Sequence, residues 1–412
     1  MSIELAGGAS TQSRAWRPLP PGAVCGTTLA ERGATETVRF DFEDGHHERR
    51  DLLSWVGGQW GGLFGASPDL SELPFDAVHL RETHGSYGHA AEHDLAAALG
   101  EVYDGLLTSD DMACRFYQDG GTACAAAVRI ARAETGRDAI ATQGYHGMHA
   151  DFAHEPAWTG YPYENVRLHH RFDFGDTRAM RNAARRASCV MVEVPAWDDE
   201  AAIAEFLQAC RDTADEFGVP FIIDDVVLGF RVALGGTCER YGVRADMVCL
   251  GKTMSATGCV SALIGRADLV GKLDGEVFAS TTFGGAPGPC SVAAATVRWL
   301  AAHRGEVYGG EVIDMTALGD AHPQFISKEN GHLRIIGDAL KDGLNALGVR
   351  CVGQPERFIT SFYGEADHRA WCSKMIGRDI LVDRPFFSML AHTPQHVEET
   401  LAAAEAIYDM QI

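Results

Sequence analysis

Short strand-like runs alternate with helical stretches through the middle of the chain. The runs have the length and the apolar content of buried strands. They lie at residues 114–117, 139–142, 189–194, 221–223 and 247–250. Apolar residues at helical spacing follow the first run and precede the fourth, and these two stretches end at Gly136 and Gly218. The alternation of strand and helix predicts a parallel, doubly wound α/β sheet.

The two ends of the chain carry weaker patterns. Residues 1–36 are rich in Gly, Pro, Ala and Thr and show no sustained period, which predicts an extended arm that packs on another element. Residues 37–42 alternate like a strand. After residue 305 the chain shows a helix, short strands and a closing helix near 396–408, a pattern typical of a separate α+β unit.

These patterns predict two domains, because a chain of 412 residues is long for a single hydrophobic core. We expect residues 76–304 to form a large domain around the predicted sheet. Residues 1–75 would supply the N-terminal arm and part of a small domain, and residues 305–412 would supply the rest of that small domain.

Composition and charge narrow the classes of function. The formal net charge is −22, which argues against binding to nucleic acid or to anionic membranes. No apolar window approaches the length that spans a bilayer, and the N-terminus lacks the apolar core of a signal peptide, so we expect a cytoplasmic protein. The 11 cysteines form no C-x-x-C pair and the 17 histidines show no metal-binding spacing, so neither a disulfide framework nor a metal site is expected.

Charged residues stand at the ends of two consecutive apolar runs. Asp224 and Asp225 follow one run, and Lys252 follows the other. Open α/β sheets bind ligands at the carboxyl ends of their strands, so these side chains are candidates for a binding site. Each has an ordinary alternative, since an aspartate at a strand end can cap a helix and a lysine can extend into solvent.

Two glycine-containing turns add further candidates. Residues 119–122, Asp-Gly-Gly-Thr, lead into a helix whose N-terminus offers N–H groups and a hydroxyl to an anion. Tyr145 follows a strand, lies between Gly144 and Gly147, and is well placed to stack on a planar ring. An ordinary helix cap and a loop-closing tyrosine are the alternatives. The aromatic connection over residues 148–175 has the length and composition of an ordered lid.

Four of these features meet the needs of one cofactor, pyridoxal 5′-phosphate (PLP): the aspartate and the lysine at the strand ends, the turn at residues 119–122, and the tyrosine between glycines. PLP requires a lysine that forms a Schiff base with its aldehyde, and an acid that pairs with its pyridine nitrogen. It also requires a phosphate site and, commonly, an aromatic side chain against its ring. Lys252 would have to lose its proton to form the Schiff base, whereas Asp224 would have to stay ionised.

Longer motifs resemble those of a known family. The segment FIIDDVVLGFRVALGG, followed by VCLGK, is similar to the D-E-V-x-x-G-F-R-x-A and G-K motifs of the class-III, fold-type-I, PLP-dependent aminotransferases. The segments AVRIARAETGRDAI, GYHG and STTFGGAPG also match, and the resemblance is greatest to the glutamate-1-semialdehyde aminomutase branch. It is clear over residues 86–300. The resemblance implies a large domain with a mostly parallel, doubly wound sheet and a smaller α+β domain.

The resemblance also implies a role for each matching residue. Lys252 would carry the Schiff base and move the proton, Asp224 would pair with the pyridine nitrogen, and Tyr145 would stack on the ring. The other cofactor contacts would come from Gly120, Gly121, Thr122, His146, Val226 and, from the second subunit of a homodimer, Thr282. Trp60 matches a substrate-side aromatic of the family, and Trp158 in the aromatic connection is a further substrate candidate.

Several departures from the family pattern leave the substrate open. Residues 120–124, Gly-Gly-Thr-Ala-Cys, stand where the family usually has S-G-T-E-A. Asp225 replaces a glutamate, and residues 193–195, Glu-Val-Pro, replace E-P. Residues 255–259 replace a glycine-rich G-G-G-x-P segment. No arginine can be assigned as a clamp for a substrate carboxylate.

Three functions are compatible with this sequence. The first is an aminotransferase that moves an amino group from a small-molecule donor to a small or specialised-metabolite carbonyl acceptor. The second is an aminomutase, an epimerase or an elimination or replacement enzyme that uses the same cofactor on an amino-acid-like substrate. The third is a non-catalytic binding protein on this scaffold, which the departures around the phosphate site motivate.

Overall fold

The computed structural model describes residues 17–57, 62–65, 70–82, 87–152, 159–257, 259–309 and 330–408. These residues form two compact units. The first unit takes its described residues from 1–59, 64–68 and 333–412, and the second takes them from 60–63 and 69–332. The sequence places domain boundaries after residues 75 and 304 instead, and those boundaries stay a prediction.

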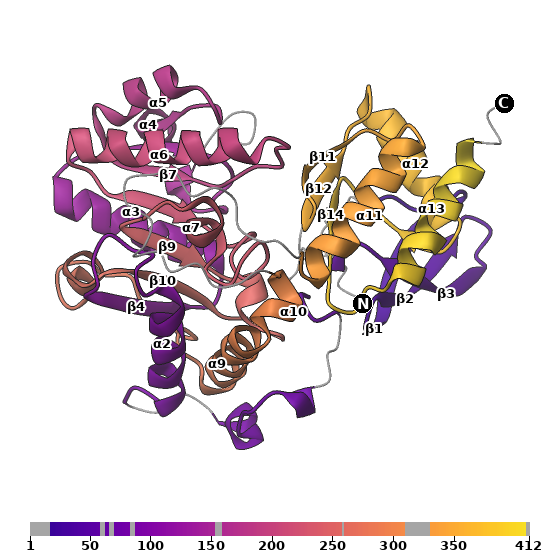
Figure 1. Cartoon of the computed structure of the whole chain (residues 1–412), viewed down its shortest axis with the longest axis horizontal. Coiled ribbons are helices and arrows are strands. Elements are labelled where there is room, and N and C mark those ends of the chain that lie inside the picture. Colours follow the sequence, from indigo (N-terminus) through magenta and orange to yellow (C-terminus); the bar gives the residue numbers. More distant parts are fainter. Residues whose placement is uncertain are drawn as a thin grey trace. The chain divides into compact units, whose positions relative to one another are not determined.

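The second unit is built on a seven-stranded sheet with the order β4-β10-β9-β8-β7-β5-β6. Figure 1 labels β4, β10, β9 and β7 of this sheet. Strands β6, β5, β7, β8 and β9 pair in parallel, whereas β10 runs antiparallel to both of its neighbours. The strands are β4 (Met112–Tyr117), β5 (Ala139–Gln143), β6 (His169–Arg171), β7 (Ala187–Val192), β8 (Phe221–Asp224), β9 (Met247–Leu250) and β10 (Ser261–Arg266). The prediction of a mostly parallel sheet is confirmed.

Helices lie on both sides of this sheet (Figure 1). The α-helices are α2 (Ala90–Tyr103), α3 (Gly120–Thr135), α4 (Tyr163–Leu168), α5 (Thr177–Ala184), α6 (Glu200–Phe217), α7 (Gly236–Tyr241), α8 (Ala267–Val270), α9 (Pro287–Ala302) and α10 (Arg304–Tyr308). The 3₁₀ turns are η3 (Leu70–Glu72), η4 (Ala77–Arg81), η5 (Ala150–Phe152), η6 (Lys252–Met254) and η7 (Gly271–Leu273).

The core of the second unit explains why the strand runs are continuously apolar. Every residue of β7, β8 and β9 is buried, because helices cover both faces of a doubly wound sheet. The face of α3 that carries Ala127 and Ile130 packs with Ile222 and Met247 in one cluster. Burying a side chain such as Ile222 contributes about 1.5–3 kcal/mol, so this layer holds the strand ends in a fixed register.

Caps at the two predicted helices follow from the sequence. Helix α3 begins after Asp119, whose carboxylate accepts the Thr122 N–H, and ends at Gly136 with a φ of 66°. Helix α6 begins after Asp199 and ends at Gly218 with a φ of 60°. Glycine adopts this left-handed conformation without the penalty that a Cβ atom brings, so both predicted helix ends are confirmed.

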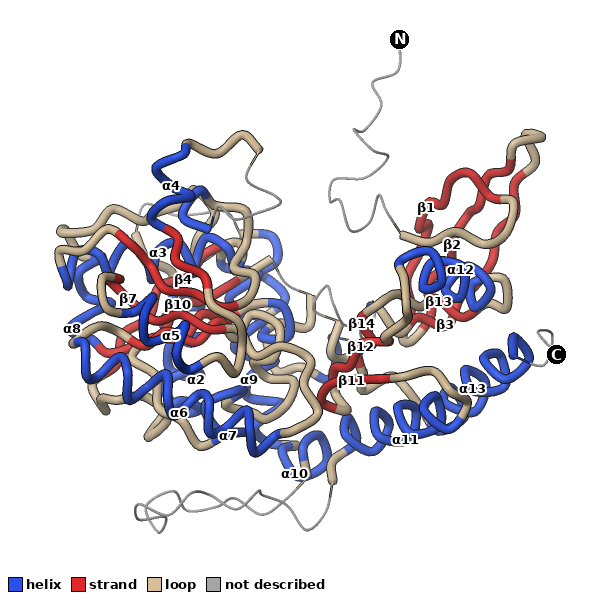
Figure 2. The backbone as a smooth tube through the Cα atoms, turned by 90° about the horizontal axis from the view of Figure 1, so that it is seen from above, coloured by secondary structure: helices blue, strands red, loops and turns tan. Residues whose placement is uncertain are grey.

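The first unit contains a four-stranded sheet of order β1-β2-β3-β13 and an antiparallel sheet of order β11-β12-β14 (Figure 2). Strand β13 pairs with β3 in parallel. The strands are β1 (Ala23–Arg32), β2 (Thr35–Phe42), β3 (His47–Ser54), β11 (Cys351–Gln354), β12 (Arg357–Thr360), β13 (Ile380–Leu381) and β14 (Pro385–Phe387). The helices are α11 (His332–Ala346), α12 (Glu365–Ile376) and α13 (Pro394–Tyr408).

Strand β1 lies where the sequence predicted only an extended arm. Nine of its ten residues are exposed, so no hydrophobic period marks the strand, and its regularity comes from antiparallel pairing with β2. Elsewhere in this unit, Trp55 stacks on His392 with ring centroids 3.8 Å apart and donates a hydrogen bond to Thr400. Among the described residues, no helix combines the length and the apolar character needed to cross a membrane.

Candidate active site

Asp224 and Lys252 lie beyond the carboxyl ends of adjacent parallel strands. Asp224 is the last residue of β8 and pairs with Cys249 of β9, and Lys252 follows β9 after Gly251. Lys252 has a φ of 42°, a left-handed conformation that costs a non-glycine residue about 1–2 kcal/mol. Strain of this kind persists only where the surrounding structure enforces it, and it often marks a functional position.

The Asp224 carboxylate is buried and held by a histidine. Its side chain is 4% exposed, and Oδ2 lies 2.7 Å from Nδ1 of His146, whose side chain is 1% exposed. The other oxygen accepts a hydrogen bond from the Val226 N–H at 3.2 Å. A buried carboxylate needs such partners, because an unpaired buried charge is costly. The thiol of Cys124 lies in the same cluster, with its sulfur within 4.8 Å of a ring nitrogen of His146 and of a carboxylate oxygen of Asp224.

The aromatic turn after β5 is anchored from a neighbouring strand. The N–H of Tyr145 donates a hydrogen bond of 2.9 Å to Oε2 of Glu193. Glu193 is the first residue after β7. Gly144 has a φ of 106°, and a Cβ atom there would lie 2.6 Å from Cβ of Glu193. Only glycine fits this approach, so Glu193 and Gly144 together fix the direction in which Tyr145 leaves the sheet.

The N-terminus of α3 packs against the same turn and against the end of β8. A Cβ atom at Gly120 would lie 2.5 Å from the Val226 side chain, and one at Gly147 would lie 2.7 Å from Cα of Gly121. A Cβ atom at Gly251 would contact Val226 at 3.4 Å. Val226 therefore connects the start of α3 with the backbone next to the lysine.

These contacts gather most of the residues predicted for the site. They join the segment 120–122, the turn 144–147, Asp224, Val226 and the Gly251-Lys252 pair. Thr282 is exposed in the single chain, in the loop before α9, and its predicted role across a subunit interface stays a prediction. Trp60 and Trp158, the two predicted substrate residues, lie outside the described residues.

Two contributors to the site, Glu193 and His149, are not predicted from the sequence. Glu193 contacts Tyr145 across 48 residues. His146 is predicted as a cofactor contact, but its contact with Asp224 across 78 residues is not. His149 lies with Nε2 3.3 Å from Oγ1 of Thr122. Only the order and register of the parallel strands bring these positions together, and periodicity alone does not give strand order.

A second polar cluster involves His79, Glu82 and His89. Each offers a ligand atom, and these atoms lie within 4.8 Å of one another. However, Nδ1 of His89 accepts the Ala91 N–H at the start of α2, which places the ring proton on Nε2, 3.1 Å from Glu82. Hydrogen bonding accounts for this arrangement, and a cation on Nε2 would remove the helix cap.

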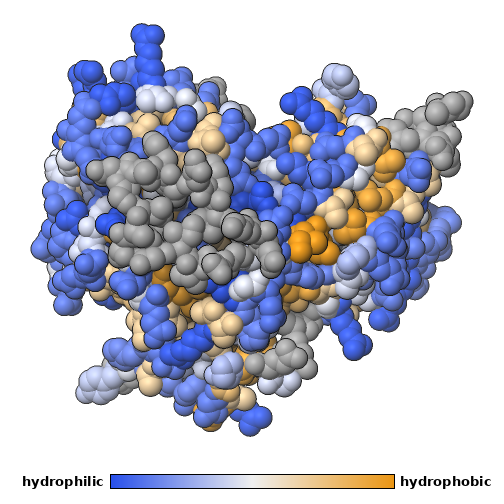
Figure 3. Space-filling model, in the orientation of Figure 1, coloured by the Kyte–Doolittle hydropathy of each residue, from blue (hydrophilic) through white to orange (hydrophobic). Residues whose placement is uncertain are grey.

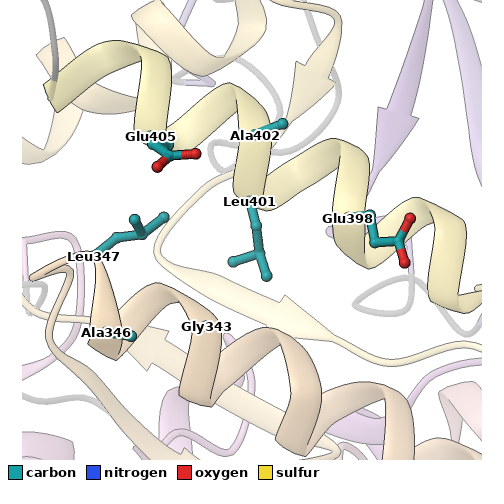
Figure 4. Close-up of a pocket in the computed structure, with 7 residues that line it drawn as sticks. All are labelled: Gly343, Ala346, Leu347, Glu398, Leu401, Ala402 and Glu405. Carbon is teal, nitrogen blue, oxygen red and sulfur yellow. The ribbon is translucent and has the colours of Figure 1, made fainter.

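A surface groove of about 360 Å³ lies between α11 and α13 in the first unit. Figure 3 shows apolar side chains reaching the surface over these helices. Leu401 points from α13 toward α11 (Figure 4), where a Cβ atom at Gly343 would lie 2.4 Å from its side chain. The lining residues are Gly343, Ala346, Leu347, Glu398, Leu401, Ala402 and Glu405. None belongs to the predicted site.

Comparison with known proteins gives the family. Residues 199–305 match the family model of the class-III aminotransferases. A glutamate-1-semialdehyde 2,1-aminomutase of Methanothermobacter thermautotrophicus is 30% identical over 318 residues, which cover 71% of this chain and 74% of that protein.

Solved structures agree with this assignment at the level of the fold. A transaminase with PLP bound has a TM-score of 0.75 at 19% identity, over 98% of this chain and 94% of that one. An omega-transaminase from Sphaerobacter thermophilus has a TM-score of 0.74 at 20% identity, with the same coverage. The chain therefore belongs to the class-III aminotransferases, PLP-dependent enzymes of fold type I.

Proposed function

We propose that this enzyme transfers an amino group from a small-molecule donor to a small or specialised-metabolite carbonyl acceptor, with Lys252, Asp224 and Tyr145 as its catalytic residues. One observation carries the proposal. A buried carboxylate paired with a histidine ends β8, and a lysine with strained backbone follows the adjacent strand β9. A structural ion pair would not require a lysine in a left-handed conformation beside it.

The residues of the site fit PLP. The buried Asp224 carboxylate is a suitable partner for a protonated ring nitrogen, and Nε2 of His146 is a buried atom without a hydrogen-bond partner among the described residues. Gly120 and Gly121 bring no side chain to the start of α3, and the backbone N–H groups of a helix N-terminus would stabilise a phosphate there. When bound, PLP supplies an aldehyde that condenses with amines and a ring that withdraws electrons from the reacting carbon.

Each residue then has a defined task. Lys252 would hold the cofactor through its Nζ atom and move a proton at the substrate carbon. Asp224, supported by His146, would keep the ring nitrogen protonated. Tyr145 and Val226 would cover the two ring faces, and Gly120, Gly121 and Thr122 would bind the phosphate. In a homodimer, Thr282 of the second copy would complete the phosphate site, while Trp60 and Trp158 would line the substrate side.

A single-turnover experiment tests amino transfer. Stoichiometric holoenzyme is mixed with an amino donor and no acceptor, and the keto product is quantified. We expect about one equivalent of keto product per site, because transfer through two half-reactions leaves the amino group on the enzyme. Lys252→Ala serves as the control and should release none. Catalytic turnover of substrate without any keto product would contradict the proposal.

Attachment of the cofactor is tested separately. Borohydride reduction followed by peptide mapping should place the PLP mass on Lys252 in the wild-type enzyme and nowhere in Lys252→Ala. A wild-type protein without this adduct would contradict the assignment of Lys252 and would favour a non-catalytic scaffold.

A second candidate is an aminomutase or a related enzyme that returns the amino group to its substrate. The name of the curated relative at 30% identity favours it. Reaction in heavy water distinguishes the two functions. A mutase or epimerase would exchange the substrate proton and give an isomer without an external acceptor, whereas an aminotransferase requires the acceptor for turnover.

A further inference from the structure

Asp119 occupies the donors at the start of α3. Its Oδ1 accepts the Thr122 N–H at 2.9 Å, and its Oδ2 accepts the Thr122 hydroxyl at 2.7 Å. Nε2 of His149 lies 3.3 Å from the same hydroxyl oxygen. One carboxylate, one hydroxyl and one imidazole therefore share this helix end.

The same two Thr122 donors are the ones assigned to the cofactor phosphate. A carboxylate and a phosphate cannot both accept from them, and two anions a few Å apart repel each other. An uncharged cap such as serine or asparagine would satisfy the helix end without this repulsion. The aspartate is therefore unfavourable for phosphate binding in a way that the helix itself does not require.

The surrounding segments leave little room for a rearranged phosphate site. The Cβ position of Gly121 lies 3.3 Å from Oδ1 of Asp119 and 3.5 Å from the His149 ring, and Gly147 packs directly on Gly121. On the other side, Val226 contacts Gly120. Because the backbone is enclosed in this way, the element that can move is the Asp119 side chain.

We propose that Asp119 is a built-in competitor for the cofactor phosphate. It caps α3 in the phosphate-free enzyme and turns away from Thr122 when the phosphate binds, while His149 contributes a donor beside Thr122. This inference rests on the proposed function, which places the phosphate at α3. Its consequence is that the phosphate adds less to cofactor affinity than an uncharged cap would permit, and the cofactor exchanges more readily.

Asp119→Asn tests the inference, because asparagine retains an oxygen for the cap and lacks the charge. The full-length apoenzyme is titrated with PLP and with pyridoxal, which lacks the phosphate, and binding is followed by absorbance and tryptophan fluorescence. We expect the variant to bind PLP about tenfold more tightly, because the negative charge of Asp119 no longer repels the phosphate that bonds to the same Thr122 donors. Pyridoxal affinity should change by less than about twofold.

Asp199→Asn is the matched control. Asp199 caps α6 in the same way, accepting the Ala202 N–H at 2.9 Å, and it is not among the site residues. This variant changes the net charge equally and should leave PLP affinity unchanged. A His149→Phe variant should weaken PLP binding, whereas His149→Gln should retain most of it, because glutamine keeps a donor.

The outcomes separate this inference from the proposed function. If Asp119→Asn binds PLP no more tightly than wild type, or tightens pyridoxal to the same degree, Asp119 is not a phosphate competitor. If no variant binds PLP through Lys252, the proposed function itself fails. Thermal unfolding verifies that the variant is folded, and Asp119→Ser provides the same comparison should Asp119→Asn be unstable.

Discussion

Asp224 and Asp225 are adjacent carboxylates with different environments. Asp225 is fully buried, accepts the N–H and hydroxyl of Thr237 at 2.8 Å and 2.6 Å, and would lie 2.0 Å from a Cβ atom at Gly236. It thus anchors the start of α7. Burial raises the pKa of Asp225 to about 7, although the Thr237 hydrogen bonds act in the opposite direction.

This raised pKa predicts a pH-dependent stability. The folded protein binds the Asp225 proton more tightly than the unfolded chain, whose aspartate titrates near 3.8. The stabilisation is complete below that value and is lost as the pH rises through about 7. From pH 5 to pH 8 we expect this residue to lower the free energy of unfolding by about 2–3 kcal/mol.

Urea unfolding of wild type and Asp225→Asn at both pH values measures this effect. The difference between the two proteins isolates Asp225, because all other groups titrate in both. From pH 5 to pH 8, the free energy of unfolding of Asp225→Asn should rise relative to that of wild type. Parallel pH profiles would contradict the assignment of the raised pKa.

At the scale of elements, the site depends on which strands are neighbours. The turn that carries Tyr145 follows β5, and Glu193 holds it from the end of β7. We expect Glu193→Leu to lower kcat/KM by about ten- to a hundredfold, because a displaced turn misplaces the ring-stacking residue. Glu193→Gln should remain near wild type, since its amide oxygen still accepts the Tyr145 N–H.

Steady-state kinetics with both variants test this role, and the visible circular dichroism of the bound cofactor reports its orientation. Glu193 is a positioning residue only if the conservative variant restores both signals. Equal losses in the two variants would instead indicate that the charge of Glu193 matters.

The sequence predicts those elements whose signals are local. The central strands are buried on both faces, so their sequences are continuous apolar runs. The glycines at the ends of α3 and α6 show in the sequence where these helices stop. Strand β1 has no apolar face, so its sequence carries no period. Contacts such as Asp225 with Thr237 or Tyr145 with Glu193 depend on backbone register, which no pattern of residue types specifies.

At the scale of the whole molecule, the proposed homodimer makes a test across subunits possible. Thr282→Glu would place a charge against the phosphate of the partner's site, and Lys252→Ala would disable the site of its own subunit. Each variant alone should be inactive. When the two chains are co-expressed in equal amounts, random pairing should restore about a quarter of wild-type activity, because half the dimers carry one intact site.

Activity measured on the co-purified mixture tests this expectation, with size-exclusion chromatography to establish the dimer. A mixture as inactive as either variant alone would show that Thr282 acts within its own subunit. Full activity of Thr282→Glu alone would show that Thr282 does not act at the site.

The first unit joins the two ends of the chain. Arg50 pairs with Asp379 across 329 residues, and Trp55 bonds to Thr400 across 345. During synthesis the second unit is complete well before the last helix is made, so its sheet can form while the strands near the N-terminus still lack their partners. Strand β3 is made early in synthesis and its partner β13 is made near the end. One edge of β3 therefore stays unpaired until translation is almost finished.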